Sequence, residues 1–430
     1  MISRPSLGSK LADSSSDRVQ IARPPLNIFV IHLVTIRTRS GPVLTGGGGG
    51  GLIHCIQLVE EWTRLGNRVT VLTNVPAMFQ GKCARIEEIG RSGPNLNSAR
   101  SESLLQPIRT SLSALTSLHK QIKFVHVPPQ EHSRSVAVAA SQNIPDIAYA
   151  LRIARRTRIP VVVTFHHLFP PPWWYPGRRG GVVRCTGAWL MSQLALLVTK
   201  IWGLAPSIDQ VRILAESGWR FPGPILRDEI FLDDRSLVPP KGGEARPIDA
   251  CIICRLSPNK GINDLIMVWN EVLRRLPSAK LVIGGDFEST RLEREFIKAR
   301  EDQKLTKSIT IRGHLTSESK RELLSASKLF VYPSYEEGWS MAVMEAAACG
   351  CVPVLYDLPA YDYLGPLAQR VPTGNREELA DRIVKLLGDS RTREDSARKL
   401  KDASNSYSVK RTAQSHLDYF QELLDRVAKR

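Results

Sequence analysis

The chain has 430 residues, of which 42% are hydrophobic and 23% are charged. That composition is ordinary for a globular protein, and the length exceeds one ordinary core, so we expect two domains. Most of the net charge of +17 lies in the first half: the balance is +14 up to Arg246 and +3 after it. A basic half attracts phosphate, anionic lipid or nucleic acid, although a basic proteome as a whole would give the same excess.

The sequence argues against a signal peptide and a membrane span. Residues 1–24 are rich in Ser and charged residues and contain no apolar run, which predicts a disordered tail. The most apolar segment, 188–204, is too short to span a bilayer. Trp189 and Trp202 permit an interfacial helix there, but a buried core helix is the favoured interpretation. We therefore predict a cytoplasmic protein, able to lie peripherally on the cytosolic face of a membrane.

The cysteine spacing does not predict a metal site. Cys251 and Cys254 lie in an apolar run typical of a buried strand, where side chains three apart point to opposite faces. No second Cys or His pair completes a tetrahedral set. All seven cysteines are expected to be reduced, as is usual for thiols in the cytosol.

The first half opens like an α/β domain. Residues 26–34 resemble a buried parallel strand, a loop with six consecutive glycines follows, and 52–65 show helical apolar spacing before a strand at 68–73. This unit predicts a doubly wound sheet. The loop glycines, Gly47 and Gly48 among them, would let a ligand approach the backbone. No acidic residue closes the second strand, which argues against a dinucleotide site.

Two histidines follow a later strand of this half. Residues 161–165 are predicted as a buried strand, and His166 and His167 come directly after its carboxyl end, where a ligand could be met. The next loop contains Trp173 and Trp174, which could stack on a sugar ring or enter a membrane surface. From position alone, an alternative in which one His caps the loop and the other packs is equally consistent.

The other elements of the first half follow from apolar spacing and end signals. We predict strands at 123–127 and 136–140 and helices at 145–156, 189–202 and 207–217, the last capped by Ser207. Residues 75–120 have little periodicity and resemble an inserted loop.

The second half starts with another strand and another short loop. Arg255 and Lys260 stand at the two ends of the loop between a strand at 250–254 and a helix at 262–276. Two cations beside a helix N-terminus would suit a diphosphate that leaves with negative charge. Taken alone, they are more simply two solvated surface charges.

The stretch 332–354 predicts a ligand site. A strand ends at its first residue, a Pro-Ser-Tyr-Glu-Glu-Gly loop follows, and a helix is expected over 341–349. Gly338 lets a ligand come close to the backbone, and the helix N-terminus presents amides to an anion. Glu337 and Glu345 can both face a ligand lying across the helix start. Amides for a diphosphate and carboxylates for hydroxyl groups suit a sugar nucleotide.

The remaining elements continue the alternation of strands and helices. Further strands are predicted at 280–283, 308–312 and 352–356. Helices are predicted between the turn at 284–286 and about 304, at 317–326 with Ser317 as cap, at 377–387 and at 408–430. The predicted organisation is a tail at 1–24, a first domain at 25–221, a linker at 222–247, a second domain at 248–407 and a final helix at 408–430.

Together these motifs resemble one family. Two α/β halves, a Gly-rich first loop, Arg-x4-Lys-Gly after the second half's first strand and a Glu-x7-Glu pair resemble the retaining GT-B glycosyltransferases of group one, family four. The similarity covers roughly 26–74 and 136–425 and is most specific over 332–354. It implies an α/β fold of two Rossmann-like, doubly wound domains facing across a cleft, with the last helix crossing back to the first domain.

The resemblance also implies roles for individual residues. Glu337 would bind the donor sugar's hydroxyls, Glu345 the ribose, and Arg255 and Lys260 the diphosphate, while His166 would lie beside the reacting sugar. Further donor contacts would come from Gly47, Gly48, Gly313, His314, Gly338, Trp339, Ser340 and Met341. His167 stands where relatives often carry an acidic residue, so it joins Trp173 and Trp174 as an acceptor-side candidate.

The implied activity is retaining transfer of a sugar, expected to be a hexose, in glycan, glycolipid or polysaccharide biosynthesis. The donor would be of UDP or GDP type, and no metal or cofactor would be needed, since Arg255 and Lys260 supply positive charge. The expected partners are a lipid-linked, phosphorylated or glycan acceptor and an anionic membrane surface. Nucleic acid is not expected, because no aromatic RNA-type motif is present. The alternatives are a GT-B-fold nucleotide-sugar epimerase and a non-catalytic nucleotide-sugar-binding module.

Overall fold

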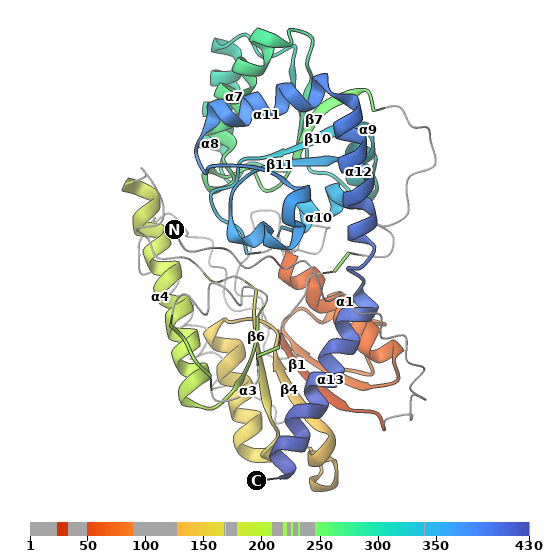
Figure 1. Ribbon diagram of the computed structural model, residues 1–430. Helices are drawn as coiled ribbons and strands as arrows, with labels where there is room; N and C mark the ends of the chain where they lie inside the picture. Colours follow the sequence, from red (N-terminus) through yellow and green to blue (C-terminus); the bar gives the residue numbers. More distant parts are fainter. Residues whose placement is uncertain are drawn as a thin grey trace.

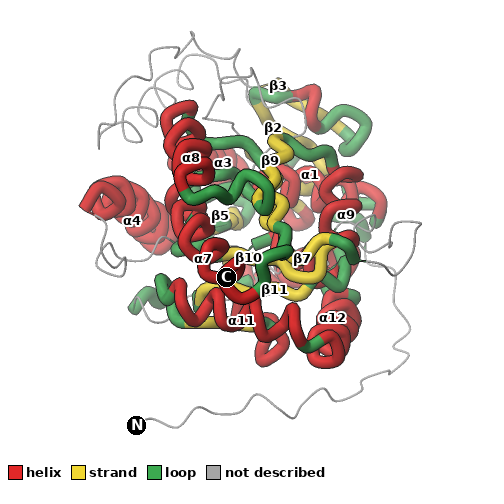
Figure 2. The backbone as a smooth tube through the Cα atoms, turned by 90° about the horizontal axis from the view of Figure 1, so that it is seen from above, coloured by secondary structure: helices red, strands yellow, loops and turns green. Residues whose placement is uncertain are grey.

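The structure is a computed structural model that describes residues 24–32, 50–88, 127–166, 168, 179–208, 218–221, 225–226, 231–232, 246–338 and 340–429. Figure 1 shows two α/β domains, one above the other, each built on its own sheet. Seen from above, helices lie on both sides of the strands (Figure 2). Both domains are therefore doubly wound, as predicted.

The first domain contains a six-stranded sheet of order β3-β2-β1-β4-β5-β6 in which neighbouring strands run parallel. Its elements are β1 (Asn27–His32), α1 (Gly50–Arg64), β2 (Arg68–Thr73), β3 (Arg85–Glu88), β4 (Ser135–Ala139), α3 (Ile144–Thr157), β5 (Val161–Phe165), α4 (Arg179–Ile201) and β6 (Ala205–Ile208), with short 3-10 turns at Pro76–Met78 and Pro129–Arg134.

The second domain contains a six-stranded parallel sheet of order β12-β11-β10-β7-β8-β9. Its elements are β7 (Ile248–Ile253), α7 (Ile262–Arg275), β8 (Leu281–Gly284), α8 (Thr290–Asp302), β9 (Ile309–Gly313), α9 (Ser317–Ala326), β10 (Ser327–Tyr332), α10 (Met341–Ala348), β11 (Val352–Tyr356), β12 (Gln369–Val371), α11 (Arg376–Gly388) and α12 (Ser390–Ser404), with 3-10 turns at Pro258–Lys260 and Pro359–Leu367; the last helix of the chain is α13 (Val409–Ala428).

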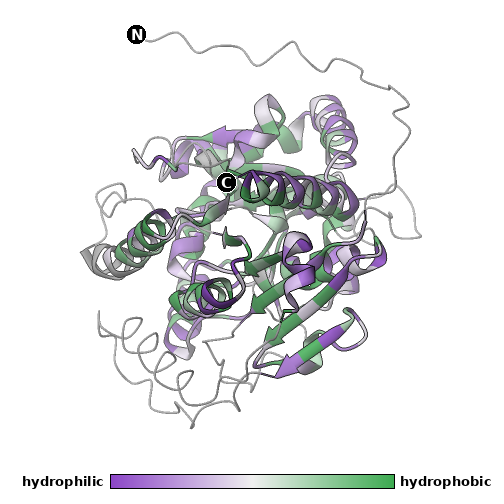
Figure 3. Ribbon diagram, turned by 90° about the horizontal axis from the view of Figure 1, so that it is seen from below, coloured by the Kyte–Doolittle hydropathy of each residue, from purple (hydrophilic) through white to green (hydrophobic). Residues whose placement is uncertain are grey.

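Strand order reverses once in each sheet, between β1 and β4 and between β7 and β10. At such a point the two connections leave in opposite directions, which opens a crevice outside the carboxyl ends of the strands. The central strands are buried on both faces, because helices cover both sides: every residue of β4, β5 and β11 is buried. In Figure 3, strands in the middle of the molecule are drawn largely in the green of hydrophobic residues.

The last helix crosses back to the first domain. In Figure 1 α12 belongs to the upper domain and α13 runs along the lower one. The α13 side chain Phe420 is fully buried and makes an edge-on contact with Trp62 of α1, with ring centroids 5.6 Å apart. The Leu232 N–H donates to the carbonyl of Tyr407 at 3.1 Å, so Leu232 lies beside the segment that leads into α13.

Some predicted elements were wrong or incomplete. The predicted helix start at Ser207 is contradicted, because Ala205–Ile208 is the buried edge strand β6, paired with β5; positions 209–217 of that predicted helix lie outside the described residues. A serine before an apolar run looks like a helix cap locally, but pairing with a neighbouring strand decides its conformation. The cap of α9 is Thr316 and not Ser317. Helix α4 starts at Arg179, ten residues earlier than predicted, and α12 was not predicted.

The packing of α13 predicts a large stability effect at Phe420. Replacing Phe420 with Ala removes a fully buried ring and leaves a cavity against α1, so the free energy of unfolding should fall by about 3–5 kcal/mol. Urea denaturation measures this change. The matched control Val427→Ala lies on the same helix with its side chain 48% exposed, and it should change stability by less than about 0.5 kcal/mol. Equal effects of the two substitutions would contradict the observed packing.

Candidate functional site

The loops that follow β7 and β10 meet where the strand order of the second sheet reverses. Lys260 Nζ lies 2.5 Å from Glu337 Oε1 and donates to the Glu336 carbonyl at 3.3 Å. The two side chains of this ion pair are only 17% and 7% exposed. Two residues 77 positions apart in the sequence, each predicted to bind the donor, therefore lie in direct contact.

Backbone contacts hold the two loops together. The Tyr335 N–H donates to the Asn259 carbonyl at 2.8 Å, and the Ser334 hydroxyl donates to the same carbonyl at 3.3 Å. Gly261 has a φ of +69°, and a Cβ at this position would lie 1.9 Å from the carbonyl oxygen of Pro333. Only glycine fits there, because any side chain would push the two loops apart. The glycine of the Lys-Gly pair thus has a steric function.

A buried carboxylate that the sequence analysis did not identify supports this junction. Asp264 in the first turn of α7 is fully buried and accepts hydrogen bonds from the hydroxyls of Tyr335 at 2.6 Å and Tyr356 at 2.8 Å. Arg376 Nε lies 3.1 Å from its other oxygen, which compensates the buried charge. Burial, followed by the Asp264 charge, raises the pKa of Tyr356. In the sequence, Asp264 looks like an ordinary acidic residue of a helix start.

Helix α10 begins as predicted and carries the second carboxylate. Ser340 caps it, its Oγ accepting from the Val343 N–H at 3.4 Å. One turn into the helix, Glu345 is buried and contacts Lys320 Nζ of α9 at 2.5 Å. Lys320 was also missed, because nothing near it in the sequence indicates that α9 packs beside α10. Each of the two glutamates, Glu337 and Glu345, therefore has its own lysine.

The remaining donor-side candidates lie around the same sheet edge. Arg255 is exposed just after the end of β7. Burial raises the pKa of the adjacent Cys254 thiol to about 12, and the charges of Lys260, Glu337 and Arg255 have smaller effects on that pKa. Gly313 ends β9, two strands away from β7. The adjacent His314 is exposed, with Nδ1 3.4 Å from Asp286 Oδ2. These residues extend the candidate site along the edge from the Lys260–Glu337 pair.

In the first domain, His166 lies at the carboxyl end of β5. Its Nε2 is 2.7 Å from the carbonyl oxygen of Ala140, and its backbone N–H donates to Gln142 Oε1 at 3.1 Å. A carbonyl can only accept a hydrogen bond, so Nε2 must carry a hydrogen. The ring is therefore held in one orientation by the segment that follows β4, beside the point where the strand order reverses.

Two further histidines surround His166, and neither was singled out from the sequence. The His54 ring of α1 makes an edge-on contact with His166 at 5.8 Å between centroids and stacks on Phe231 at 4.7 Å. At the end of β1, burial, followed by the charge of His166, lowers the pKa of His32 to about 4. The helix after the glycine loop and the histidine after β5 are thus neighbours. In the sequence, the only signals for these two residues are the position of His32 at a strand end and of His54 near a helix start.

Several candidates lie outside the residues that the structure describes. These are Gly47, Gly48, His167, Trp173, Trp174 and Trp339. Their proposed contacts stay predictions.

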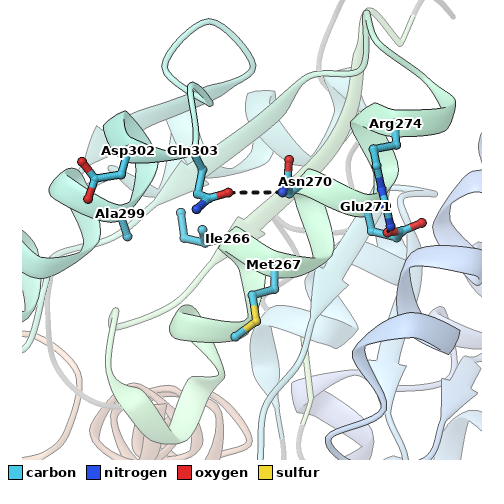
Figure 4. A pocket seen from close by; sticks show the side chains of 8 residues that line it. All are labelled: Ile266, Met267, Asn270, Glu271, Arg274, Ala299, Asp302 and Gln303. Atoms are coloured by element: carbon cyan, nitrogen blue, oxygen red, sulfur yellow. Dashed lines mark hydrogen bonds and ion pairs between the residues drawn. The ribbon is translucent and has the colours of Figure 1, made fainter.

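A separate groove lies on the outer surface of the second domain, between α7 and α8 (Figure 4). Its volume is about 590 Å³, and its lining residues are Ile266, Met267, Asn270, Glu271, Arg274, Ala299, Asp302 and Gln303. Asn270 and Gln303 form a 3.3 Å hydrogen bond across it. No residue of the Lys260–Glu337 junction lines this groove, so it is distinct from the candidate site.

Family models match both halves of the chain. Residues 48–201 match the model described as Glycosyltransferase Family 4, and residues 248–389 match the model described as Glycosyl transferases group 1. The chain belongs to this glycosyltransferase family. The two matches contain His54 and His166 in one half and the Lys260–Glu337 and Lys320–Glu345 pairs in the other.

Individual relatives cover only parts of the chain. The alpha-galactosylglucosyldiacylglycerol synthase of Streptococcus pneumoniae is 26% identical over 198 residues, which is 46% of this chain and 49% of that protein. The GDP-mannose:cellobiosyl-diphosphopolyprenol alpha-mannosyltransferase of Xanthomonas oryzae is 28% identical over 135 residues, 31% of this chain and 35% of that protein. The chain thus matches about half, or less, of the length of these two relatives.

Solved structures show the same fold. Anabaena HepE in complex with UDP and glucose superposes with a TM-score of 0.63 at 14% identity, covering 92% of this chain and 100% of HepE. Sucrose-phosphate synthase from Thermosynechococcus elongatus superposes with a TM-score of 0.66 at 14% identity, covering 93% and 100%. The GT-B fold is therefore confirmed for the two sheets and the returning helix.

The Gly261 contact predicts that alanine at this position destabilises the protein by more than backbone strain alone. Gly261→Ala adds a clash with Pro333, so we expect a loss of about 2–4 kcal/mol in the free energy of unfolding, measured in urea. The control is Gly218→Ala, where φ is +73° and no atom lies within 4 Å of the added Cβ. That substitution should cost about 1 kcal/mol. Equal losses would argue against close packing of the two loops.

The lowered pKa of His32 predicts a loss of stability in acid. Between pH 6.5 and about 4 the unfolded chain binds a proton at His32 and the folded chain does not, so the free energy of unfolding falls as pH falls. At pH 4 this difference in proton binding lowers the free energy of unfolding by on the order of 3 kcal/mol. Urea denaturation at several pH values should show a shallower acid slope for His32→Gln, with parallel curves above pH 7. Parallel curves throughout would contradict the burial of a neutral His32.

Proposed function

We propose that this protein is a retaining glycosyltransferase that transfers a sugar from a nucleoside diphosphate to an acceptor hydroxyl. One observation carries the proposal: the buried Lys260–Glu337 ion pair lies at the strand-order reversal of a domain that matches group 1 glycosyltransferases. A lysine and a carboxylate side by side offer a cation for a phosphate and an acceptor for sugar hydroxyls.

The charges of the site suit a nucleoside diphosphate sugar. Lys260 and the exposed Arg255 would hold the diphosphate, with the amides at the start of α10 as further donors. Glu337 would accept hydrogen bonds from the sugar, and Glu345 from the ribose. Lys320 would hold Glu345 in place, since it contacts the carboxylate at 2.5 Å. Gly313 and His314, farther along the sheet edge, would lie beside the base.

In the proposed reaction the acceptor oxygen forms a bond to the anomeric carbon on the same face from which the diphosphate leaves. The bond between that carbon and the phosphate oxygen breaks, its electron pair stays on the diphosphate, and the proton of the acceptor hydroxyl passes to the leaving phosphate oxygen on the same face. Arg255 and Lys260 stabilise this charge, which supplies a route that needs no metal ion. Retention follows from attack on the front face of an oxocarbenium-like centre. His166, oriented by the Ala140 carbonyl, would lie beside the reacting sugar.

The acceptor proposed here is a lipid-linked, phosphorylated or glycan molecule on the cytosolic face of a membrane. The names of the two relatives given above contain a diacylglycerol and a diphosphopolyprenol. Those names, together with the basic first half, support an amphiphilic acceptor. Donors of UDP and GDP type are both consistent, since HepE was solved with UDP and the Xanthomonas enzyme is named for GDP-mannose. Within the described residues, no helix is long and apolar enough to cross a bilayer.

Donor binding provides a test that needs no known acceptor. A panel of UDP- and GDP-sugars should raise the melting temperature of the wild-type protein with one or a few donors, because a ligand that binds only the folded state stabilises it by mass action. Lys260→Ala and Glu337→Ala should each remove most of this shift and lower transfer at least roughly a hundredfold. Full donor stabilisation and activity in either variant would overturn the assignment.

The matched control is Lys328→Ala. Lys328 forms an ion pair with Asp249 at 2.7 Å in the same domain, and neither residue belongs to the candidate site. This substitution removes one partly buried lysine ion pair, as Lys260→Ala does, but it should leave donor stabilisation unchanged. Loss of the shift in both variants would show that domain destabilisation, and not donor contact, is responsible.

A further inference from the structure

Helix α4 exposes apolar side chains on the face where an ordinary surface helix carries polar ones. Four apolar side chains point outward along it at helical spacing: Leu190 is 52% exposed, Leu194 43%, Leu197 42% and Ile201 67%. At 100° per residue these positions fall on one narrow stripe. We call Leu190, Leu194, Leu197 and Ile201 the α4 stripe. In an aqueous surface helix, this stripe is where polar residues would be expected.

The opposite face of α4 is buried and partly polar. Ala195 and Leu196 pack into the first domain's core, together with the hydroxyl residues Ser192 and Thr199. The Thr199 hydroxyl is satisfied by the Ala195 carbonyl at 2.7 Å, so it tolerates burial. The helix is therefore already packed on its inner side, and the core does not need the stripe. The sequence-based preference for a fully buried helix at 188–204 is wrong for this outer face.

The position of α4 makes the stripe accessible along its length. Figures 1 and 2 both show α4 at the periphery of the molecule, beside the first domain and away from the second sheet. Its 23 residues correspond to a rod of about 35 Å. The α4 stripe occupies about 17 Å of this length, from Leu190 to Ile201, and an exposed apolar stripe of that extent on an aqueous surface indicates a binding face.

The positive charge around α4 indicates that a partner of this helix would be anionic. Residues 144–208 contain eight Lys and Arg residues and a single acidic residue, Asp146, which is 1% exposed. At the C-terminal end of the stripe, the Arg155 guanidinium lies 4.0 Å from the centre of the Trp202 ring, and Lys200 and Trp202 are exposed. Neither Arg155 nor Lys200 forms an ion pair with any residue that the structure describes. Apolar residues, tryptophan and unneutralised cations together match the boundary of an anionic bilayer.

We propose that α4 is the face by which this protein binds an anionic lipid bilayer, with the α4 stripe entering the boundary between headgroups and acyl chains and Arg155 and Lys200 contacting lipid phosphates. A second copy of this chain fits less well, because two such faces would bring together two surfaces of the same positive charge. This inference deepens the proposed function, since it names the surface that would bring the enzyme to a membrane-bound acceptor.

Vesicle co-sedimentation of the full chain, at low salt and without donor, tests the proposal. The wild-type protein should bind vesicles of phosphatidylcholine mixed with phosphatidylglycerol, bind phosphatidylcholine alone far more weakly, and dissociate as salt rises. The double variant Leu194→Gln/Leu197→Gln should bind the mixed vesicles roughly tenfold less tightly. The matched control Met267→Gln/Val427→Gln changes two apolar residues of similar exposure on α7 and α13, at 52% and 48%, and should bind like wild type.

A second pair of variants separates charge from apolar contact. Arg155→Gln/Lys200→Gln should weaken binding to the mixed vesicles roughly tenfold, whereas Lys298→Gln/Lys410→Gln, which removes two exposed charges elsewhere, should not. Absence of wild-type binding, or equal binding by the stripe variant, would overturn the proposal. Self-association in analytical ultracentrifugation that the stripe variant abolishes, with vesicle binding unchanged, would assign the face to a second copy and also overturn it.

Failure of this inference and failure of the proposed function are distinguishable. The α4 variants should keep the thermal shift produced by the donor sugar, because α4 contributes no residue to the donor site. Lys260→Ala should lose that shift and keep vesicle binding. Vesicle binding that depends on Lys260, and not on the α4 stripe, would contradict the separate roles assigned to the two regions.

Discussion

The candidate site depends on the junction between the loop after β7 and the loop after β10. A strand-order reversal places these loops side by side, and a parallel sheet makes both leave from the same edge. The bond from the Tyr335 N–H to the Asn259 carbonyl and the absence of a side chain at Gly261 then allow close contact. The Lys260–Glu337 pair is a consequence of that contact. Without it, the two charges would be unrelated surface residues.

Buried charge in this domain is compensated pair by pair. Glu337 has Lys260, Glu345 has Lys320, and Asp264 has Arg376 together with two tyrosine hydroxyls. Leaving any one of these carboxylates without its partner would cost several kcal/mol. The same pairing holds each carboxylate in one position, which is what recognition of sugar hydroxyls requires. Stability and preorganisation of the site therefore rest on the same contacts.

The first domain combines a histidine cluster with the returning helix. His54 joins His166 to Phe231, and Phe231 directly precedes Leu232, which pairs with Tyr407 just before α13. The histidine cluster thus contacts Phe231, the neighbour in sequence of the residue that pairs with the segment leading into α13. On another side of the same domain, α4 carries an apolar stripe amid basic residues. The proposed donor site, the histidine cluster and the proposed bilayer contact lie in three different parts of the fold.

The sequence alone was sufficient to predict the features that depend on local patterns of residues. Apolar runs and Gly-rich loops predicted the two doubly wound domains, and the spacing of Arg255, Lys260, Glu337 and Glu345 predicted which loops carry charge. These signals are local because a strand, the loop after it and the next helix are continuous in the chain. Helix α10 begins at Met341 as expected, and Ser340 is its cap.

Only the tertiary structure decided what depends on contacts between distant segments. Asp264, Lys320 and His54 have no distinctive sequence neighbours, and their importance appears once α7, α9 and α1 are packed. Ser207 shows the converse, because pairing with β5 overrides its local preference for a helix cap. The α4 helix has apolar residues on both its inner and its outer face, so its sequence could not show which side the core would cover. The physical reason is common to all of these: burial and pairing are properties of the assembled fold, and no short segment contains them.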